Sequence, residues 1–132
     1  TQAVADTIEP GDHASTFGAN PVVCAAAQVV FSKISAPEFL EHVRWAGSYL
    51  GERLEELQGK YDTIAEVRGR GLIWGLETEI DVAPLIETCH ENGLLTCSAG
   101  SKVLRLVPPL VVEEPELDEA VAILDRAFAA TQ

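Results

Sequence analysis

The sequence predicts an α+β fold, in which helices cover a small and mainly antiparallel sheet. Two runs rich in β-branched and apolar residues flank Gly69-Arg70-Gly71, a pattern typical of strands joined by a tight connection. Strand-like and helix-like segments do not alternate one by one, which favours antiparallel pairing over repeated parallel crossovers. With 132 residues, of which 47% are apolar, the chain is long enough to bury a core of its own.

A first long helix is predicted from Pro21 to Ile34. Asn20 is a favoured N-cap residue, and Pro21 suits the first helical position, where its missing N–H would be unpaired anyway. The helix is apolar on almost every side, which is typical of a helix enclosed by a larger structure. A central helix within a compact domain of this chain is the alternative interpretation.

Three more helices are predicted further along the chain. The segment from Ser35 to Glu38 resembles a capping box, and Gly59 marks the end of the helix that it opens. Asp81 is expected to cap a short helix over Val82–Glu91, and the last helix is predicted over Pro115–Ala129. Core-facing positions are Leu40, Val43, Gly47, Leu50, Leu54 and Leu57 in the first of these, and Leu117, Val121, Leu124 and Phe128 in the last.

Four short strands are predicted, over Thr63–Arg68, Leu72–Glu77, Leu94–Cys97 and Val103–Val107. Ala99-Gly100 provides a turn between the last two strands. The adjacent prolines after Val107 lack backbone N–H donors, so the last strand is expected to end there.

The composition excludes several classes of function. A net charge of −12 disfavours nucleic acid and anionic membranes as partners, since both attract clustered lysine and arginine. No uncharged apolar run reaches about 18 residues, so no membrane span is predicted. Cys24, Cys89 and Cys97 have no CxxC pairing and no ligand spacing with a histidine, so neither a metal site nor a catalytic thiol is expected. A reducing, cytoplasmic compartment is the simplest interpretation.

The segment from Gly11 to Pro21 is a candidate binding loop. Ser15 and Thr16 offer adjacent hydroxyls just ahead of a helix N-terminus, and the flanking glycines let the chain bend closely around a ligand. Hydroxyls, backbone N–H groups and a helix N-terminus together suit a phosphate. A capped turn without a ligand is the alternative.

Arg105 is a candidate for binding a carboxylate. It is the single charged residue of an apolar strand, and burial of an arginine is costly unless an anion meets it. Its planar guanidinium suits bidentate contact with a carboxylate. The alternatives are an internal ion pair with Glu66 or Glu77 on a neighbouring strand, or a side chain that reaches water.

Two other charged clusters are expected to be structural. Arg68 and Arg70 flank Gly69 and could meet an anionic ligand, but solvation or pairing with local carboxylates is the expected role. The acidic residues that begin with Glu113 precede the last helix, where they are expected to stabilise its positive N-terminus rather than form a catalytic pair.

Four ordered motifs resemble the C-terminal part of class III, pyridoxal-phosphate-dependent aminotransferases. They are GDHASTFGANP, the apolar helix that follows it, VRGRGLIWGLE and VLRLVPPLVV, and the resemblance covers nearly the whole chain. Within that class, the sequence is most similar to the acetylornithine type. The resemblance implies a fold-type I small domain over residues 20–132, preceded over residues 1–19 by the tail of the large, cofactor-binding domain.

The resemblance also implies roles for three residues. Ser15 and Thr16 would reach the phosphate of the cofactor, pyridoxal 5'-phosphate, at a homodimer interface, with the Thr16 hydroxyl in direct contact. Arg105 would bind the α-carboxylate of the amino-acid or oxo-acid substrate. The implied reaction transfers an amino group from an amino-acid donor to 2-oxoglutarate, in arginine or lysine biosynthesis.

The chain also departs from the family pattern. Ala14 and Ala19 stand where relatives often have glycine, and the family's catalytic lysine belongs to the upstream large domain. Lys33, Lys60 and Lys102 are not in the surroundings of that lysine, so no catalytic residue is expected and the chain alone should be inactive. The alternatives are another class III ω-aminotransferase, using ornithine, succinylornithine, 4-aminobutyrate or lysine, or a non-catalytic α+β interaction domain.

Overall fold

The structure is a computed structural model that describes residues 1–9, 18 and 20–131. It divides into two units, Thr1–Ala36 and Pro37–Gln132. The segment that carries Ser15 and Thr16 lies outside the described residues, so the predicted phosphate site stays a prediction.

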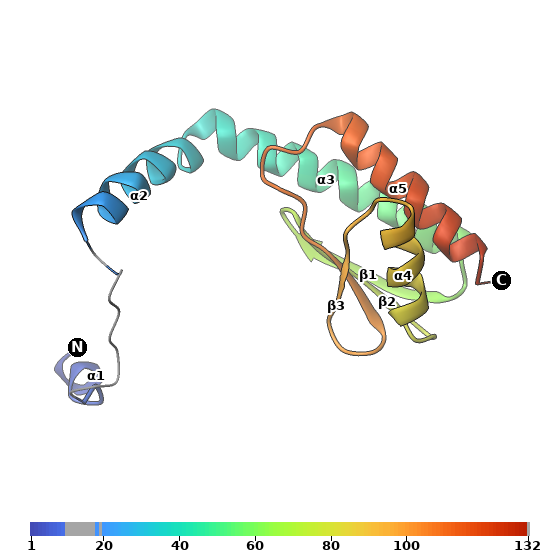
Figure 1. Ribbon diagram of the computed structural model, residues 1–132, viewed down its shortest axis with the longest axis horizontal. Helices are drawn as coiled ribbons and strands as arrows, with labels where there is room; N and C mark the ends of the chain where they lie inside the picture. Colours follow the sequence, from blue (N-terminus) through green and yellow to red (C-terminus); the bar gives the residue numbers. More distant parts are fainter. Residues whose placement is uncertain (10–17, 19, 132) are drawn as a thin grey trace. The chain divides into compact units, whose positions relative to one another are not determined.

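The first unit contains the short helix α1 (Gln2–Ala5) and the helix α2 (Pro21–Ile34), shown in blue in Figure 1. The Asn20 side chain accepts hydrogen bonds from the backbone N–H of Val22 at 3.1 Å and of Val23 at 3.0 Å, as the predicted N-cap requires. No residue of α2 is buried among the described residues, and Phe31 is 69% exposed.

The second unit is built on a four-stranded antiparallel sheet. The strand order is β1 (Ile64–Arg70), β2 (Ile73–Thr78), β4 (Val103–Leu106) and β3 (Cys97–Ser98), with every neighbouring pair antiparallel. The predicted α+β fold with a mainly antiparallel sheet is confirmed.

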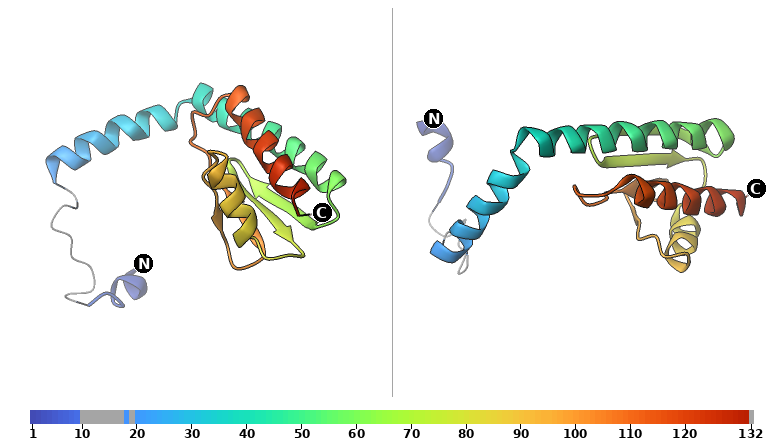
Figure 2. Two further views of the ribbon diagram at one scale, coloured as in Figure 1. Left: turned by 45° about the vertical axis from the view of Figure 1, so that its right-hand side comes forward. Right: turned by 90° about the horizontal axis from the view of Figure 1, so that it is seen from above.

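Three helices pack against this sheet: α3 (Pro37–Lys60), α4 (Ala83–Glu91) and α5 (Glu114–Ala129). Helices α3 and α5 run side by side, and α4 contacts both α5 and β3 (Figures 1 and 2). Their buried residues are Ala46, Gly47, Leu50, Gly51, Leu54 and Leu57 in α3, Leu85 and Cys89 in α4, and Leu117, Val121, Ile123, Leu124, Ala127 and Phe128 in α5.

The two faces of the sheet have different surroundings. Leu76, Leu104 and Leu106 alternate along β2 and β4 and are at most 5% exposed, so their face lies against the helices. The residues between them, Glu77 and Arg105, point to the other face and are partly or fully exposed. This second face, here called the open face, carries the charged side chains of the sheet.

Glycines let α3 lie unusually close to the β1–β2 hairpin. A Cβ at Gly47 would lie 2.4 Å from the carbonyl oxygen of Gly71, so the helix and the connection touch through their backbones. Gly51 and Gly69 make room for the Trp74 ring, which a Cβ at either position would approach to 2.5 Å or less. Trp74 Nε1 also donates a hydrogen bond to the Gly71 carbonyl oxygen at 2.9 Å.

The caps of the helices agree only in part with those predicted from the sequence. Ser35 is the C-cap of α2, and its hydroxyl donates to the Phe31 carbonyl oxygen at 2.7 Å, so the capping box predicted there is wrong. A capping box instead opens α5, where Glu113 and Glu116 satisfy each other's backbone N–H groups. Asp81 accepts from the Ala83 N–H at 2.8 Å, in agreement with its predicted role at the start of α4.

By length and composition, no single helix among the described residues could cross a membrane. The helices α2 and α3, taken together as one interrupted span, do meet those two criteria.

Candidate functional site

The candidate site is a row of four residues that crosses the open face. Arg105 on β4 is paired with Gly75 on β2 and with Cys97 on β3, and Gly75 is paired in turn with Arg68 on β1. Residues directly opposite in a sheet project from the same face, so the row carries two guanidinium groups and a thiol. Gly75 adds no side chain between the two arginines.

Arg105 is exposed and has no carboxylate partner among the described residues. Its Nε donates a hydrogen bond to Cys97 Sγ over 3.3 Å, which leaves the terminal nitrogens of the guanidinium available. A bidentate carboxylate contact uses two N–H groups of this planar fork. The alternative of an ion pair with Glu66 or Glu77 is wrong for Arg105, because neither pair is formed. The side chain is exposed rather than buried, so it reaches water, as the second alternative expected.

Arg68 holds both of those carboxylates instead. Its Nη1 donates to Glu66 Oε2 at 2.8 Å and also to Glu77 Oε2. The hydrogen bond to Glu77, followed by the charges of both carboxylates, raises the pKa of Arg68 above its ordinary value. Pairing of Arg68 with local carboxylates was the expected role, and it is confirmed.

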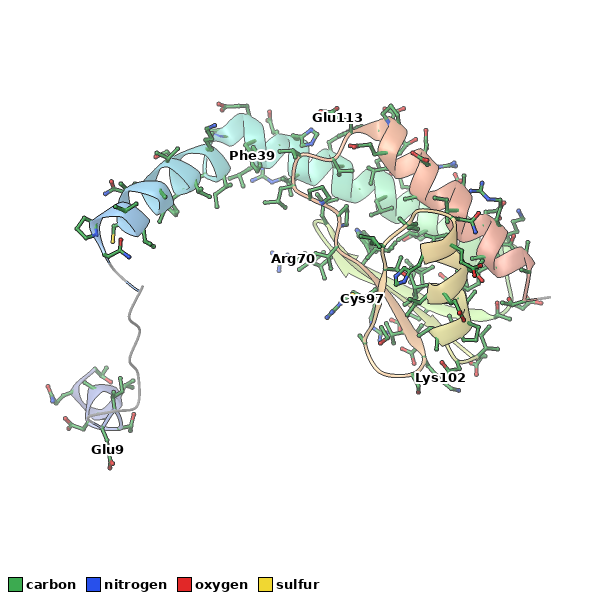
Figure 3. All side chains as sticks on the ribbon, in the orientation of Figure 1. Glu9, Phe39, Arg70, Cys97, Lys102 and Glu113 are labelled. Carbon is green, nitrogen blue, oxygen red and sulfur yellow. The ribbon has the colours of Figure 1, made fainter. Side chains whose placement is uncertain are left out.

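An open hollow lies over the part of the row formed by Arg68, Gly75 and Arg105. Its lining includes Arg68, Arg70 and Arg105 together with Ile73, Trp74 and Val103. The Arg70 side chain extends away from β1 at one edge of the sheet, and Cys97 lies on β3 at the opposite edge (Figure 3). Within the part of the chain that the structure describes, Arg70 and Arg105 have no carboxylate within 4.0 Å, so the hollow is suited to an anion.

Cys97 and Gly75 are the residues of this site that sequence reasoning missed. Gly75 stood between two apolar positions of a predicted strand, and Cys97 was judged only as a metal ligand or nucleophile. The signal that could have found them is the pairing of the strands, since both lie directly opposite Arg105. The described cysteines are all free thiols.

The lysine with the most contacts is structural. Lys60 Nζ donates to Asp125 at 2.6 Å, and the buried Tyr61 hydroxyl donates to the same carboxylate at 2.7 Å. The hydrogen bond to Asp125 raises the pKa of Lys60, which keeps the amine protonated and makes it a poor nucleophile. Among the described residues, no lysine lines the hollow around Arg105, and no group of three or more His, Cys, Asp or Glu could hold a metal.

The fold and the hollow together define an α+β domain with a candidate site for a carboxylate or a similar anion. The family described as aminotransferase class-III matches residues 1–128. The chain therefore belongs to the class III aminotransferase family.

Two curated relatives show which enzymes within the family this chain is similar to in sequence. The acetylornithine aminotransferase of Caldanaerobacter subterraneus subsp. tengcongensis is 48% identical over 122 residues, which are 92% of this chain and 31% of that protein. The acetylornithine aminotransferase of Synechocystis sp. is 46% identical over 129 residues, 94% of this chain and 30% of that protein. The chain thus spans about a third of the length of the curated relatives that it matches.

Solved structures agree on the fold. The acetylornithine aminotransferase from Elizabethkingia anophelis matches with a TM-score of 0.80 and 32% identity, over 96% of this chain and 34% of that one. The ornithine aminotransferase from Toxoplasma gondii ME49 matches with a TM-score of 0.80 and 33% identity, over 97% of this chain and 31% of that one. The fold alone does not separate these two enzymes.

Proposed function

We propose that this chain is the C-terminal, substrate-carboxylate-binding part of an acetylornithine-type aminotransferase. The observation that carries the proposal is Arg105, an exposed arginine without a carboxylate partner on a sheet face where the nearest arginine has two. Curated relatives of the acetylornithine type at 48% and 46% identity support that choice within the family. In the proposed reaction, an amino group passes from an amino-acid donor to 2-oxoglutarate, as arginine biosynthesis requires.

Arg105 would orient the substrate. The α-carboxylate is common to the amino-acid and oxo-acid partners of an amino transfer, so one cationic site can serve both halves of the reaction. A bidentate contact fixes the plane of the carboxylate as well as its position, which presents the neighbouring carbon in a constant orientation. The contact from Nε to Cys97 Sγ restrains the guanidinium without using its two terminal nitrogens.

The implied cofactor is pyridoxal 5'-phosphate. The chain has hydroxyl groups that suit its phosphate but no lysine at the described hollow. Ser15 and Thr16 have the hydroxyls that suit its phosphate, although they lie outside the described residues. No lysine lines the hollow within the described part of the chain, so the amine that anchors the cofactor would come from the rest of a longer protein. When bound, the cofactor supplies the electron sink for the reaction.

The principal test replaces Arg105 by alanine in the full-length protein. We expect KM for glutamate and for 2-oxoglutarate to rise at least tenfold, about 1.4 kcal/mol of binding free energy, because a charge-assisted contact is lost. Arg126→Ala is the matched control, since Arg126 is an exposed arginine on α5 that does not line the hollow. Equal KM values in the Arg105→Ala variant and the parent would refute the assignment.

A separate test addresses the phosphate site. We expect Thr16→Ala to raise the dissociation constant of pyridoxal 5'-phosphate and Thr16→Ser to restore most of the affinity, because serine retains the hydroxyl. Equilibrium binding followed by the absorbance of the cofactor measures both values. An unaltered dissociation constant in Thr16→Ala would remove Thr16 from the site.

The amino donor is tested by comparing kcat/KM for N-acetylornithine, ornithine and 4-aminobutyrate. The likeness to the Toxoplasma gondii ornithine aminotransferase makes ornithine the second candidate. A higher kcat/KM for ornithine than for N-acetylornithine would overturn the acetylornithine type while leaving the family intact.

Two further parts of the proposal concern assembly and location. We expect the full-length enzyme to be a homodimer, because the phosphate would be shared between two subunits, and size-exclusion chromatography with light scattering tests this. A cytoplasmic location is consistent with the free thiols of the described cysteines. The chain alone is expected to show no transamination, since it supplies no lysine to the hollow in its described part.

A further inference from the structure

Glu77 has two arginines within reach on the open face. It lies opposite Glu66 on β1 and opposite Val103 on β4. Arg68 is two residues beyond Glu66, and Arg105 is two residues beyond Val103, so each arginine is a diagonal neighbour of Glu77. Diagonal neighbours in a sheet are about 7–8 Å apart at Cα, which the long side chains of glutamate and arginine easily span.

In the structure, Glu77 pairs with Arg68 and not with Arg105. Arg68 Nη1 bridges Glu77 and Glu66, and its side chain is 48% exposed. Glu66 and Glu77 are directly opposite each other, so their like charges would repel without a cation between them. Arg68 therefore relieves that repulsion as well as making two ion pairs.

Without Arg68, Arg105 would be the nearest cation across the next strand pair. Gly75, the residue opposite Arg105, has no side chain, and the apolar Val103 side chain beside it, 3.2 Å from where a Cβ of Gly75 would lie, offers Glu77 no competing polar partner. Repulsion from Glu66 would add to the tendency of Glu77 to turn towards β4. The resulting internal ion pair would occupy the same guanidinium nitrogens that a substrate carboxylate uses.

We propose that Arg68 is a positioning residue that holds Glu77 away from Arg105 and so keeps Arg105 available for the substrate carboxylate. This inference rests on the proposed function of Arg105. In this role Arg68 acts through Glu77 and needs no contact with the substrate, which the rescue experiment below tests. Its part is to prevent a carboxylate of the chain from competing with the carboxylate of the substrate.

The size of the effect follows from the strength of an exposed ion pair. If the pair of Glu77 with Arg105 were favoured about fivefold over the open state, KM would rise by a factor of about six, which corresponds to about 1 kcal/mol. Only binding is affected, since substrate that reaches Arg105 meets an unchanged site. We therefore expect kcat to change less than twofold.

The experiment uses the full-length enzyme and the variants Arg68→Met, Glu77→Gln and the double variant. Arg68→Met should raise KM for both glutamate and 2-oxoglutarate about sixfold, and the dissociation constant of 2-oxoglutarate by calorimetry should rise by a similar factor. Glu77→Gln alone should leave both constants within twofold. The double variant should return both to near the parent values, because the competing carboxylate is gone. Glu66→Gln is the control for loss of a carboxylate that is not a neighbour of Arg105.

Rescue by Glu77→Gln separates this role from the alternatives. If Arg68→Met raises KM but the double variant does not recover, Arg68 acts on the substrate or on the fold, and the inference is overturned. It is also overturned if Arg68→Met leaves KM unchanged while Arg105→Ala raises it. An unchanged KM in Arg105→Ala would instead overturn the proposed function, and this inference with it.

Discussion

Replacement of Gly47 by alanine tests how closely α3 lies against the β1–β2 hairpin. The added Cβ would be 2.4 Å from the carbonyl oxygen of Gly71 and 2.8 Å from its carbonyl carbon. Both atoms belong to the backbone and cannot rotate away, so the helix and the hairpin must separate. The same oxygen accepts the hydrogen bond from Trp74 Nε1 at 2.9 Å, and a shift of Gly71 weakens that bond as well.

The expected loss can be worked out from these contacts. Overpacking costs about 1–3 kcal/mol, and loss of a neutral hydrogen bond costs about 1 kcal/mol. Alanine recovers about 1 kcal/mol relative to glycine within a helix. The free energy of unfolding should therefore fall by about 1–3 kcal/mol, which lowers Tm by roughly 5–20 °C for a domain of this size.

Urea and thermal denaturation followed by tryptophan fluorescence measure this change, since Trp74 lies at the contact. Gly59→Ala is the matched control, because Gly59 is on the same helix and nothing lies within 4 Å of its added Cβ. That variant should be as stable as the parent or more stable by up to about 1 kcal/mol. A Gly47→Ala protein as stable as the parent would refute the backbone contact between α3 and the hairpin.

Three further predictions concern the hydrophobic core, the dependence of Tm on acidic pH and a helix cap. Leu104→Ala should lower the free energy of unfolding by about 2–5 kcal/mol in urea denaturation, because Leu104 is fully buried and its removal leaves a cavity. Hydrogen bonds from Lys60 and Tyr61 lower the pKa of Asp125 below its ordinary value of 3.8, so its carboxylate stabilises the fold above that pH and less as the pH falls. Asp125→Asn should therefore lower Tm at neutral pH and have little effect in strong acid, as thermal scans across pH would show. Glu113→Ala removes the capping box of α5 and should cost about 1 kcal/mol in the same denaturation assay.

The helices were predictable where their end signals are local. Asn20 and Pro21 set the start of α2 from sequence alone, because an N-cap needs only the residues next to it. The strand predicted over Leu94–Cys97 is present only from Cys97, as β3, because local contacts hold the residues before it. The Leu94 N–H donates to the Cys89 carbonyl oxygen at 2.9 Å, and the His90 ring lies 3.0 Å from the Thr96 carbonyl oxygen. These contacts keep residues 94–96 at the end of α4, so only Cys97 and Ser98 pair in the sheet.

The close contacts between α3 and the β1–β2 hairpin could not be predicted from the sequence pattern. Gly47 occupied a position in the apolar stripe of α3, where it was expected to face the core, but nothing in the stripe indicated that Gly71 would lie against it. The place of the Trp74 ring between Gly51 and Gly69 depends in the same way on two elements meeting. Such contacts are set by the packing of the helix on the sheet, which periodicity alone does not contain.

The availability of Arg105 also depends on more than its own strand. Sequence alternation placed Arg105 and Glu77 on one face and made their pairing a reasonable expectation. The neighbouring strand β1 changes this expectation, because Glu66 stands opposite Glu77 and Arg68 forms ion pairs with both carboxylates. In the proposed site, an isolated arginine in an apolar strand therefore indicates carboxylate binding only together with a second cation, here Arg68, that already holds the local carboxylates.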